Sequence, residues 1–211
     1  MIDTKQKILN TAERLFGEQG YAATSLRQVI AEAEVNVAAV HYHFGCKEDL
    51  LHAVLSRNAD PLTAARMERL DRVEREAGGD PPDVEKVLEA FLIPTAEMAQ
   101  HSPRFVRLMG RMLNDGMMPV IVEKHFRDSA MRFVHALSRA VPHLGQDELM
   151  WRIHFMIGAM DHTMGNAPLF AMVPSDADYD TRMRRLIAFL GSGFRAPAEQ
   201  TRMEEQTMRS R

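Results

Sequence analysis

Cysteine is almost absent from this chain: Cys46 is the one cysteine among 211 residues. A single thiol excludes an intrachain disulfide framework and a multi-cysteine zinc site, and it suits the reducing cytoplasm, where we expect the protein to act. Long apolar runs are also missing, and no segment approaches the roughly 20 residues of a membrane helix. We therefore expect no membrane partner.

Neither sign of charge dominates, because 26 Lys and Arg face 29 Asp and Glu for a formal net charge of −3. Nonspecific coating of nucleic acid depends on neutralising phosphates, so this balance argues against it. It leaves open a dimer that reads DNA through two small surfaces. By contrast, apolar residues make up 45% of the chain and methionine is frequent, at 16 residues. This composition is typical of a globular protein with a packed core.

The hydrophobic pattern is helical almost throughout, and no strand-like alternation competes with it. The first helix has an apolar face formed by Ile8, Leu9, Ala12, Leu15 and Phe16. A second helix is expected after Ser25, a third at about 36–43 and a fourth at 47–77. Beyond the breaker at Gly78–Pro82, further helices are predicted at 83–100, 103–114, 119–140, 147–165 and 178–193.

The stretch from Thr24 to Leu55 contains two short helical segments joined by about three residues, which predicts a helix-turn-helix. The second helix of such a unit enters the major groove of DNA, which is ~12 Å wide. Its side chains that are small or can hydrogen-bond are expected to face outward toward DNA: Asn36, Ala38, Ala39, His41 and Tyr42. Tyr42 and Lys47 suit phosphate contacts that fix the register on the duplex.

Over its first 55 or so residues, the chain resembles the DNA-binding domain of the TetR family of bacterial transcriptional repressors. The matching residues are Ile8-Leu9, Ala12, Leu15-Phe16, Gly20-Tyr21, Thr24-Ser25, Ile30-Ala31, Val35, Tyr42-His43-Phe44, Lys47-Glu48 and Leu50. The resemblance implies phosphate contact by Tyr42 and Lys47. It also implies that Thr24 and Ser25 cap the second helix toward the DNA backbone, where the nearby Arg27 is a further candidate contact.

Two residues depart from the family pattern. Glu34 stands in the turn where the family usually has glycine, and this position often needs a positive φ, so we expect either strain at Glu34 or a shifted turn. Cys46 replaces a common serine before Lys47, which is expected to weaken the cap of the fourth helix. Neither change removes an expected DNA contact.

The resemblance implies an all-α homodimer whose body binds a small molecule that changes the separation of two DNA-reading heads. We therefore predict about nine helices: a helix-turn-helix domain at 1–50, an effector-binding and dimerisation body at 51–195, and a flexible tail at 196–211. The predicted function is a ligand-responsive repressor on a pseudo-palindromic operator in double-stranded DNA. No cofactor is expected.

The methionines of the body either fill gaps in an ordinary core or line an adaptable cavity, and the residues alone leave both open. A narrower resemblance, at Val35–Gly45 and Trp151–Ala159, is to the branch of the family that responds to long-chain fatty acids or acyl-CoA. This resemblance favours a cavity for a small apolar effector, in which an arginine would bind the acid group of the effector. The expected lining is Met98, Phe105, Met109, Met112, Phe126, Phe133, Arg152, Phe155 and Met156.

The last two predicted helices carry apolar stripes that would either join a four-helix interface between subunits or pack within one monomer. These stripes comprise Ile153, Ile157, Met160, Met164, Leu186, Ile187 and Leu190. A competing hypothesis starts from His154, Asp161 and His162, which share one helical face: an all-α lipid carrier or enzyme. Because no HExxH or other ordered catalytic motif supports it, we predict no enzyme and no metal site.

Overall fold

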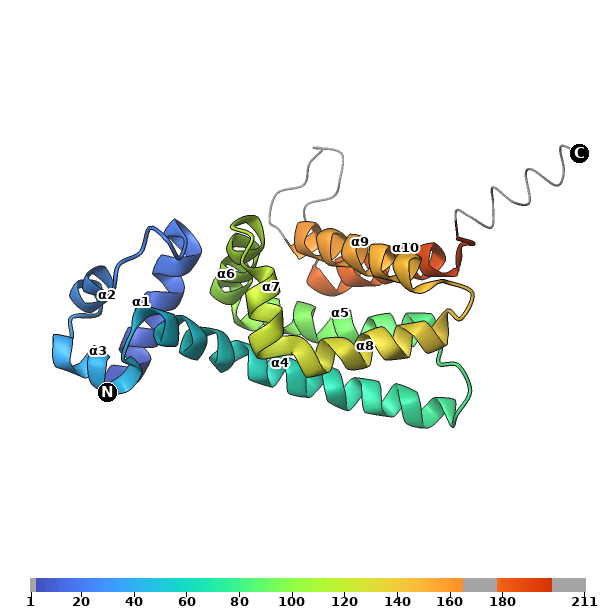
Figure 1. Ribbon diagram of the computed structural model, residues 1–211, viewed down its shortest axis with the longest axis horizontal. Helices are drawn as coiled ribbons and strands as arrows, with labels where there is room; N and C mark the ends of the chain where they lie inside the picture. Colours follow the sequence, from blue (N-terminus) through green and yellow to red (C-terminus); the bar gives the residue numbers. More distant parts are fainter. Residues whose placement is uncertain (1–2, 165–177, 199–211) are drawn as a thin grey trace, which may run out of the picture. The chain divides into compact units, whose positions relative to one another are not determined.

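The computed structural model describes residues 3–164 and 178–198, and this part of the chain is helical with no strand (Figure 1). Its helices are α1 Thr4–Gln19, α2 Leu26–Ala33, α3 Val37–Phe44, α4 Lys47–Ala77, α5 Val84–His101, α6 Pro103–Asn114, α7 Met118–Ile121, α8 Arg127–Ala140, α9 Gln146–Met164 and α10 Tyr179–Arg195. A π-helical turn, η1 at Val122–Phe126, interrupts the segment predicted as one helix at 119–140. The all-α prediction is confirmed. No described helix has the length and apolar character needed to span a membrane.

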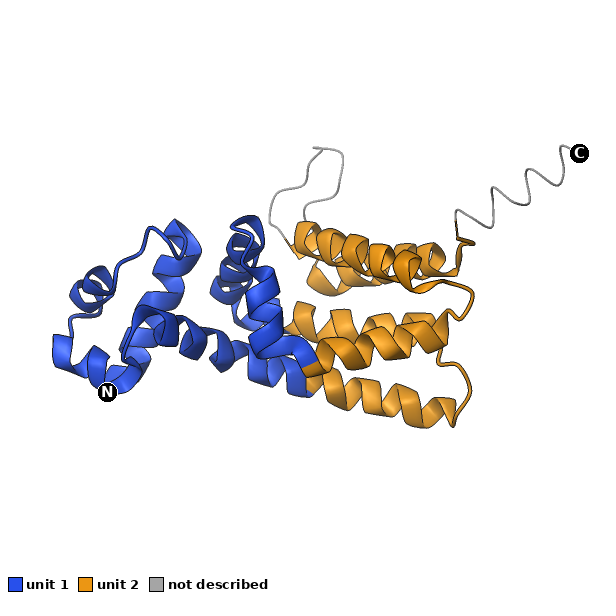
Figure 2. Ribbon diagram, viewed as in Figure 1, with its two compact units in different colours: residues 1–64, 98–127 blue, residues 65–97, 128–211 orange. Residues whose placement is uncertain are grey.

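Packing divides the chain into two compact units (Figure 2). Unit 1 holds the described residues within 1–64 and 98–127, and unit 2 holds those within 65–97 and 128–211. Residues 98–127 therefore pack with the N-terminal helices. The boundary expected at residue 50 separates a DNA-binding domain from an effector-binding and dimerisation body, and this division by function remains a prediction. Most of the expected tail, from residue 199 on, lies outside the described residues.

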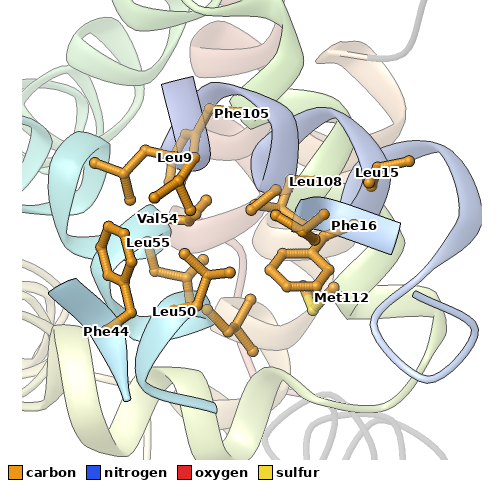
Figure 3. Packing of buried hydrophobic residues seen from close by; sticks show 14 of the residues in the cluster. Leu9, Leu15, Phe16, Phe44, Leu50, Val54, Leu55, Phe105, Leu108 and Met112 are labelled. Carbon is orange, nitrogen blue, oxygen red and sulfur yellow. The ribbon is translucent and has the colours of Figure 1, made fainter. Parts of the chain in front are cut away.

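Unit 1 is built on one apolar cluster, part of which is shown in Figure 3. The predicted inner face of α1 is at most 4% exposed at Ile8, Leu9, Ala12, Leu15 and Phe16. Residues of α2, α3, α4, α6, α7 and η1 complete the cluster. Gly17 lies where α1 meets α6, and a Cβ there would be 3.5 Å from the backbone nitrogen of Leu108. The small residue thus allows the two helices to approach closely.

A buried polar network ties α1 to α4 in unit 1. The carboxylate of Glu13 accepts hydrogen bonds from Arg57 Nη2 at 2.6 Å and from Asn58 Nδ2 at 3.0 Å. Arg57 Nη1 also donates to Asn10 Oδ1 at 2.7 Å. Because Glu13 is 6% exposed, its charge depends on these partners for compensation. The network fixes the helix that follows the predicted helix-turn-helix.

In unit 2, α9 and α10 pack against each other, and Arg152 binds the end of α10. Its guanidinium donates to the carbonyl oxygens of Gly193, Phe194 and Ala196 at 2.6–3.1 Å. It also forms an ion pair with Glu148 at 2.6 Å. The last carbonyls of a helix have no partner within the helix, so Arg152 stabilises this terminus.

Candidate nucleic-acid interface

The turn between α2 and α3 is formed by residues 34–36 and has an unusual backbone. Glu34 has φ 54° and ψ 45°, and among the described residues it is the one non-glycine with positive φ. Its N–H donates to the Ala31 carbonyl at 3.2 Å, and the N–H of Val35 donates to the Ile30 carbonyl at 3.3 Å. The strain predicted from the sequence is present, and the turn is not shifted.

α3 begins with a cap supplied by its own preceding residue. The Asn36 side-chain Oδ1 accepts a hydrogen bond from the Ala38 N–H at 2.9 Å, which satisfies a helix donor that lacks an intrahelical partner. Asn36 was predicted only as a base contact, and the cap shows that its oxygen already has a structural role. On its inner face, α3 packs into the unit 1 cluster through Val40, which is fully buried, and Phe44, which is 7% exposed.

The outer face of α3 is small and polar, as predicted. Asn36, Ala38, His41 and Tyr42 are exposed, and Ala39 is half-buried. Val37, which the sequence did not indicate, is also exposed on this helix. Two adjacent alanines leave the helix backbone accessible to a close-fitting partner such as a groove of DNA.

His41 is oriented by the end of its own helix. Its Nδ1 lies 3.0 Å from the carbonyl oxygen of Gly45. A carbonyl accepts only, so in the neutral imidazole this contact selects the tautomer with the proton on Nδ1 and leaves Nε2 as an acceptor. His41 therefore offers a hydrogen-bond acceptor from the exposed face of α3.

Tyr42 and Lys47 lie on either side of the α3–α4 junction. Tyr42 is 86% exposed, and its ring meets the His43 ring edge-on at a centroid distance of 5.1 Å. The Lys47 ammonium lies 4.2 Å from the centroid of the Tyr21 ring, an arrangement that restricts a flexible side chain. Partial burial lowers the pKa of Lys47. The geometry presents a hydroxyl and a cation, the two groups expected to contact phosphates.

Cys46 acts at the start of α4 in place of the usual serine. Its Sγ accepts from the Asp49 N–H at 3.5 Å and donates to Asp49 Oδ2 at 2.9 Å. The second bond is the main reason that the pKa of Asp49 is lowered. The thiol therefore still caps the helix, through a long contact to sulfur.

The N-terminus of α2 confirms one predicted cap and corrects the other. Ser25 Oγ accepts from the Gln28 N–H at 3.1 Å, as expected. Thr24 does not cap α2: it is 1% exposed, and its hydroxyl donates to the carbonyl oxygens of Gly20 at 2.9 Å and Leu15 at 3.3 Å. The Thr24 side chain is thus used inside unit 1, whereas Arg27 is exposed near the helix start.

The residues predicted to line an effector cavity are divided between the two units. Phe105, Met112 and Phe126 are buried in the unit 1 cluster, and Met98 and Met109 pack against it. This arrangement matches the alternative of ordinary core packing. In unit 2, Phe133 is 4% exposed and Met156 is 3% exposed, whereas Phe155 is 61% exposed. The Arg152 assignment is corrected, because its guanidinium binds the end of α10.

The predicted dimer stripe is largely inside the protomer. Met164, Leu186, Ile187 and Leu190 are between 4% and 8% exposed, because they belong to the buried side of α9 and α10. The remaining members of the stripe, all half-buried, are Ile153, Ile157 and Met160.

The apolar surface of these helices lies elsewhere. Trp151 is 59% exposed and stacks on Phe155 at a centroid distance of 5.7 Å, and Phe189 on α10 is 72% exposed. The sequence signal for the first pair was an aromatic residue repeated after four positions on one helix.

The face considered for an enzyme has little preorganisation. His154 is exposed and meets the Trp151 ring edge-on at 5.8 Å, and His162 is exposed. Asp161 is half-buried, and burial raises its pKa. Within the described ranges, no three His, Cys, Asp or Glu residues come together as metal ligands.

The short helix α3 follows α2 after a three-residue turn, is capped by Asn36 and packs on a small helical core. This arrangement is that of a helix-turn-helix DNA-binding protein. Comparison with family models agrees: residues 8–54 match the bacterial regulatory proteins of the tetR family, and residues 87–193 match the tetracyclin repressor-like C-terminal domain. The chain belongs to the TetR family of transcriptional regulators. It is accordingly a regulator of transcription and not an enzyme.

The curated relatives that the chain matches are similar to it over short stretches. An HTH-type transcriptional repressor of Mycobacterium tuberculosis is 46% identical over 56 residues, which are 26% of this chain and 30% of the relative. The HTH-type regulator YerO of Bacillus subtilis is 29% identical over 82 residues, or 39% of this chain and 27% of the relative. The chain thus matches less than a third of the length of either relative.

The fold likeness extends further than the sequence likeness. A TetR-like transcriptional regulator from Rhodococcus superposes with a TM-score of 0.61 and 16% identity, covering 90% of this chain and 94% of that one. At this level of identity the comparison shows a shared fold.

Proposed function

We propose that this protein is a homodimeric repressor that binds a pseudo-palindromic operator and is released by a small apolar effector. The observation that supports this most directly is the outer face of α3, where small and hydrogen-bonding side chains surround an accessible helix. A regulator of this kind acts where the chromosome is, so we place it in the cytoplasm. The proposed DNA contacts are Ser25, Arg27, Asn36, Ala38, Ala39, His41, Tyr42 and Lys47.

Within this proposal, α3 reads bases with few side chains. Ala38 and Ala39 let the helix approach the base edges and contact thymine methyl groups. His41 Nε2 accepts from an exocyclic amino group, which only adenine and cytosine present in the major groove. Because Asn36 Oδ1 is engaged in the cap, its amide N–H groups are the part that would reach an acceptor.

Phosphate contacts are assigned to Tyr42 and Lys47. Quantitative binding to a selected operator tests them, since phosphate contacts set the salt dependence of affinity with a slope of about −0.9 per contact. In a dimer, Lys47→Ala removes two contacts, so the slope becomes shallower by about two. Tyr42→Phe removes two hydrogen bonds to charged groups per dimer, each worth about 1.5 kcal/mol or more, and is expected to weaken binding about a hundredfold or more.

The matched control for these variants is Lys86→Ala in unit 2, where Lys86 forms an exposed ion pair with Glu76 at 2.8 Å. It removes one positive charge per chain, as Lys47→Ala does, but should leave the salt slope unchanged. Equal salt slopes for the wild type, Lys47→Ala and Lys86→Ala would refute the assignment of Lys47 to a phosphate. An unchanged affinity of Tyr42→Phe would refute the role of the tyrosine hydroxyl.

We propose that a second copy of the chain covers the aromatic surface of Trp151, Phe155 and Phe189. These side chains are 59%, 61% and 72% exposed, and exposed aromatic groups of this size gain about 1.5–3 kcal/mol each when buried. A two-fold dimer would place two α3 helices in successive major grooves, about 34–36 Å apart.

Trp151→Glu tests this surface by sedimentation equilibrium, because a buried unpaired charge opposes association. The variant should be monomeric and should lose operator binding. Met131→Glu is the control, since Met131 is 62% exposed on α8, outside the surface. A Trp151→Glu protein that stays dimeric would refute this interface.

For the effector, the resemblance to the acyl-responsive branch makes a long-chain fatty acid or acyl-CoA our proposal. Native mass spectrometry of purified protein would detect a co-purified acyl chain. Release of operator by added acyl compound is the functional test. Protein that binds operator equally well with and without acyl-CoA or fatty acid would exclude this effector class.

A further inference from the structure

Unit 2 contains a buried guanidinium that no carboxylate neutralises within the described chain. Arg66, on α4, is 6% exposed. Its Nε donates to the Phe91 carbonyl oxygen at 3.1 Å, and its Nη2 donates to Thr95 Oγ1 at 2.7 Å. One turn further along, Arg69 has an acidic partner, Glu97, at 2.6 Å. Arg66 has only neutral partners among the described residues.

The charge of Arg66 persists despite its burial. Desolvation lowers the pKa of Arg66 to about 9, and no neighbouring charge contributes to this shift. The group is therefore still protonated at neutral pH. Burying an ion costs several kcal/mol, and an anion that pairs with it recovers much of this cost. A guanidinium has five N–H donors, and the two bonds to Phe91 and Thr95 use two of them.

The surroundings of Arg66 combine an apolar wall with oriented polar groups. The guanidinium carbon lies 3.8 Å from the centroid of the Phe91 ring, and that ring meets Phe133 edge-on at 4.9 Å. The Thr95 hydroxyl donates to the Phe91 carbonyl at 3.1 Å, so it faces Arg66 with its lone pairs. Phe133 and Thr95 are 4% and 7% exposed.

Pro94 lies within the same turn of α5. Proline has no N–H, so Pro94 cannot donate the usual helical hydrogen bond to the Ala90 carbonyl. The neighbouring Phe91 carbonyl accepts from both Thr95 and Arg66.

We propose that Arg66 is the anion-binding group of a ligand site in unit 2, and that its ligand is an organic acid with an apolar body. The carboxylate pairs with the guanidinium, whose fork of N–H groups matches two carboxylate oxygens. The apolar body packs on Phe91 and Phe133. This names the chemistry of the effector and rests on the proposed function only for the step from binding to DNA release.

Binding measured without DNA tests the site itself. The probes are linear C6–C12 carboxylic acids and phenylalkanoic acids, each with its primary amide as a neutral match of nearly equal shape. Isothermal titration should show wild-type protein binding acids at least about tenfold more tightly than amides, because hydrogen bonds to a charged group are the stronger ones. Acids that bind no more tightly than their amides would overturn the proposal.

Two variants distinguish binding of the acid by Arg66 from a general effect of positive charge on the protein. Arg66→Met keeps the length and apolar stem of the side chain and should abolish the preference for acids. Arg69→Gln, one turn away on the exposed side, should retain it. If Arg66→Met keeps the preference, the acid binds elsewhere and the assignment is wrong.

A spectroscopic readout covers the case in which Arg66→Met does not fold. The Arg66 Nε–H resonance of the wild type, assigned through its bond to Phe91, should shift on addition of acid and not of amide. A resonance that stays in place at saturating acid would also overturn the site. Acid binding with no change in operator affinity would support the Arg66 site while refuting its role as effector site. Failure of the protein to bind any operator would refute the proposed function alone.

Discussion

Glu34 is held in a left-handed backbone conformation, and Glu34→Gly is expected to stabilise the protein. Its φ of 54° and ψ of 45° place the Cβ close to the following carbonyl. For a residue with a side chain this conformation costs about 1–2 kcal/mol. Glycine adopts it freely, but loses about 0.5–1 kcal/mol through its more flexible unfolded state.

A second contribution comes from charge. Glu34 follows the last residue of α2, where the helix dipole has its negative end, so the carboxylate is unfavourable there by about 0.3–1 kcal/mol. Taken together, Glu34→Gly should raise the free energy of unfolding by about 1 kcal/mol. The same change removes a negative charge beside the proposed DNA-binding helix, so operator affinity should rise as well.

Urea unfolding of three variants separates the two contributions. Glu34→Ala removes the charge and keeps the strain, Glu34→Asn tolerates the conformation in part, and Glu34→Gly removes both. The free energy of unfolding should rise in the order Glu, Ala, Asn, Gly. If the glycine variant is no more stable than the alanine variant, the backbone strain is no larger than the ~0.5–1 kcal/mol that glycine loses in the unfolded state, and the ~1–2 kcal/mol assigned to it is refuted.

Three further variants test other parts of the account. Thr24→Val removes the buried hydroxyl that donates to Gly20 and Leu15, and should cost about 1–3 kcal/mol in urea unfolding; an unchanged midpoint would contradict its structural role. Arg152→Met should lower the protection of amide hydrogens near the end of α10, which it binds; equal protection would show that the terminus holds without it. The pKa of His125 is lowered by burial and then by His52, so the unfolded state binds more protons, and stability should fall as pH drops below about 6.5. His125→Asn should flatten this fall between pH 7.5 and 5.5, and parallel curves would contradict the assignment.

Local features of the sequence predicted the DNA-binding part well. The inner face of α1, the Ser25 cap and the strain at Glu34 each depend on residues a few positions apart, and the structure confirms all three. Pro103 likewise marked the start of α6. Such signals persist in a single sequence because helix periodicity, capping and backbone strain are set within one or two turns.

Packing between distant segments could not be predicted in this way. The ion pair of Glu13 with Arg57 joins residues 44 positions apart, and neither residue is distinguished by its neighbours in the sequence. The periodicity of α10 showed that Leu186 and Leu190 share a face, but it could not show whether that face meets the same chain or a second copy. Arg66 was not selected at all, because burial of an arginine depends on the helices around it.

The central claim is that two copies of α3 read a dyad-symmetric DNA sequence. Selection of bound duplexes from a random pool, using the purified full chain, tests it most directly. We expect an enriched inverted repeat with half-sites about one helical turn apart or somewhat more, and relaxed preference at one position per half-site for His41→Ala. Lys86→Ala should select the same repeat as the wild type. No enrichment, or an enriched sequence without dyad symmetry, would contradict the account.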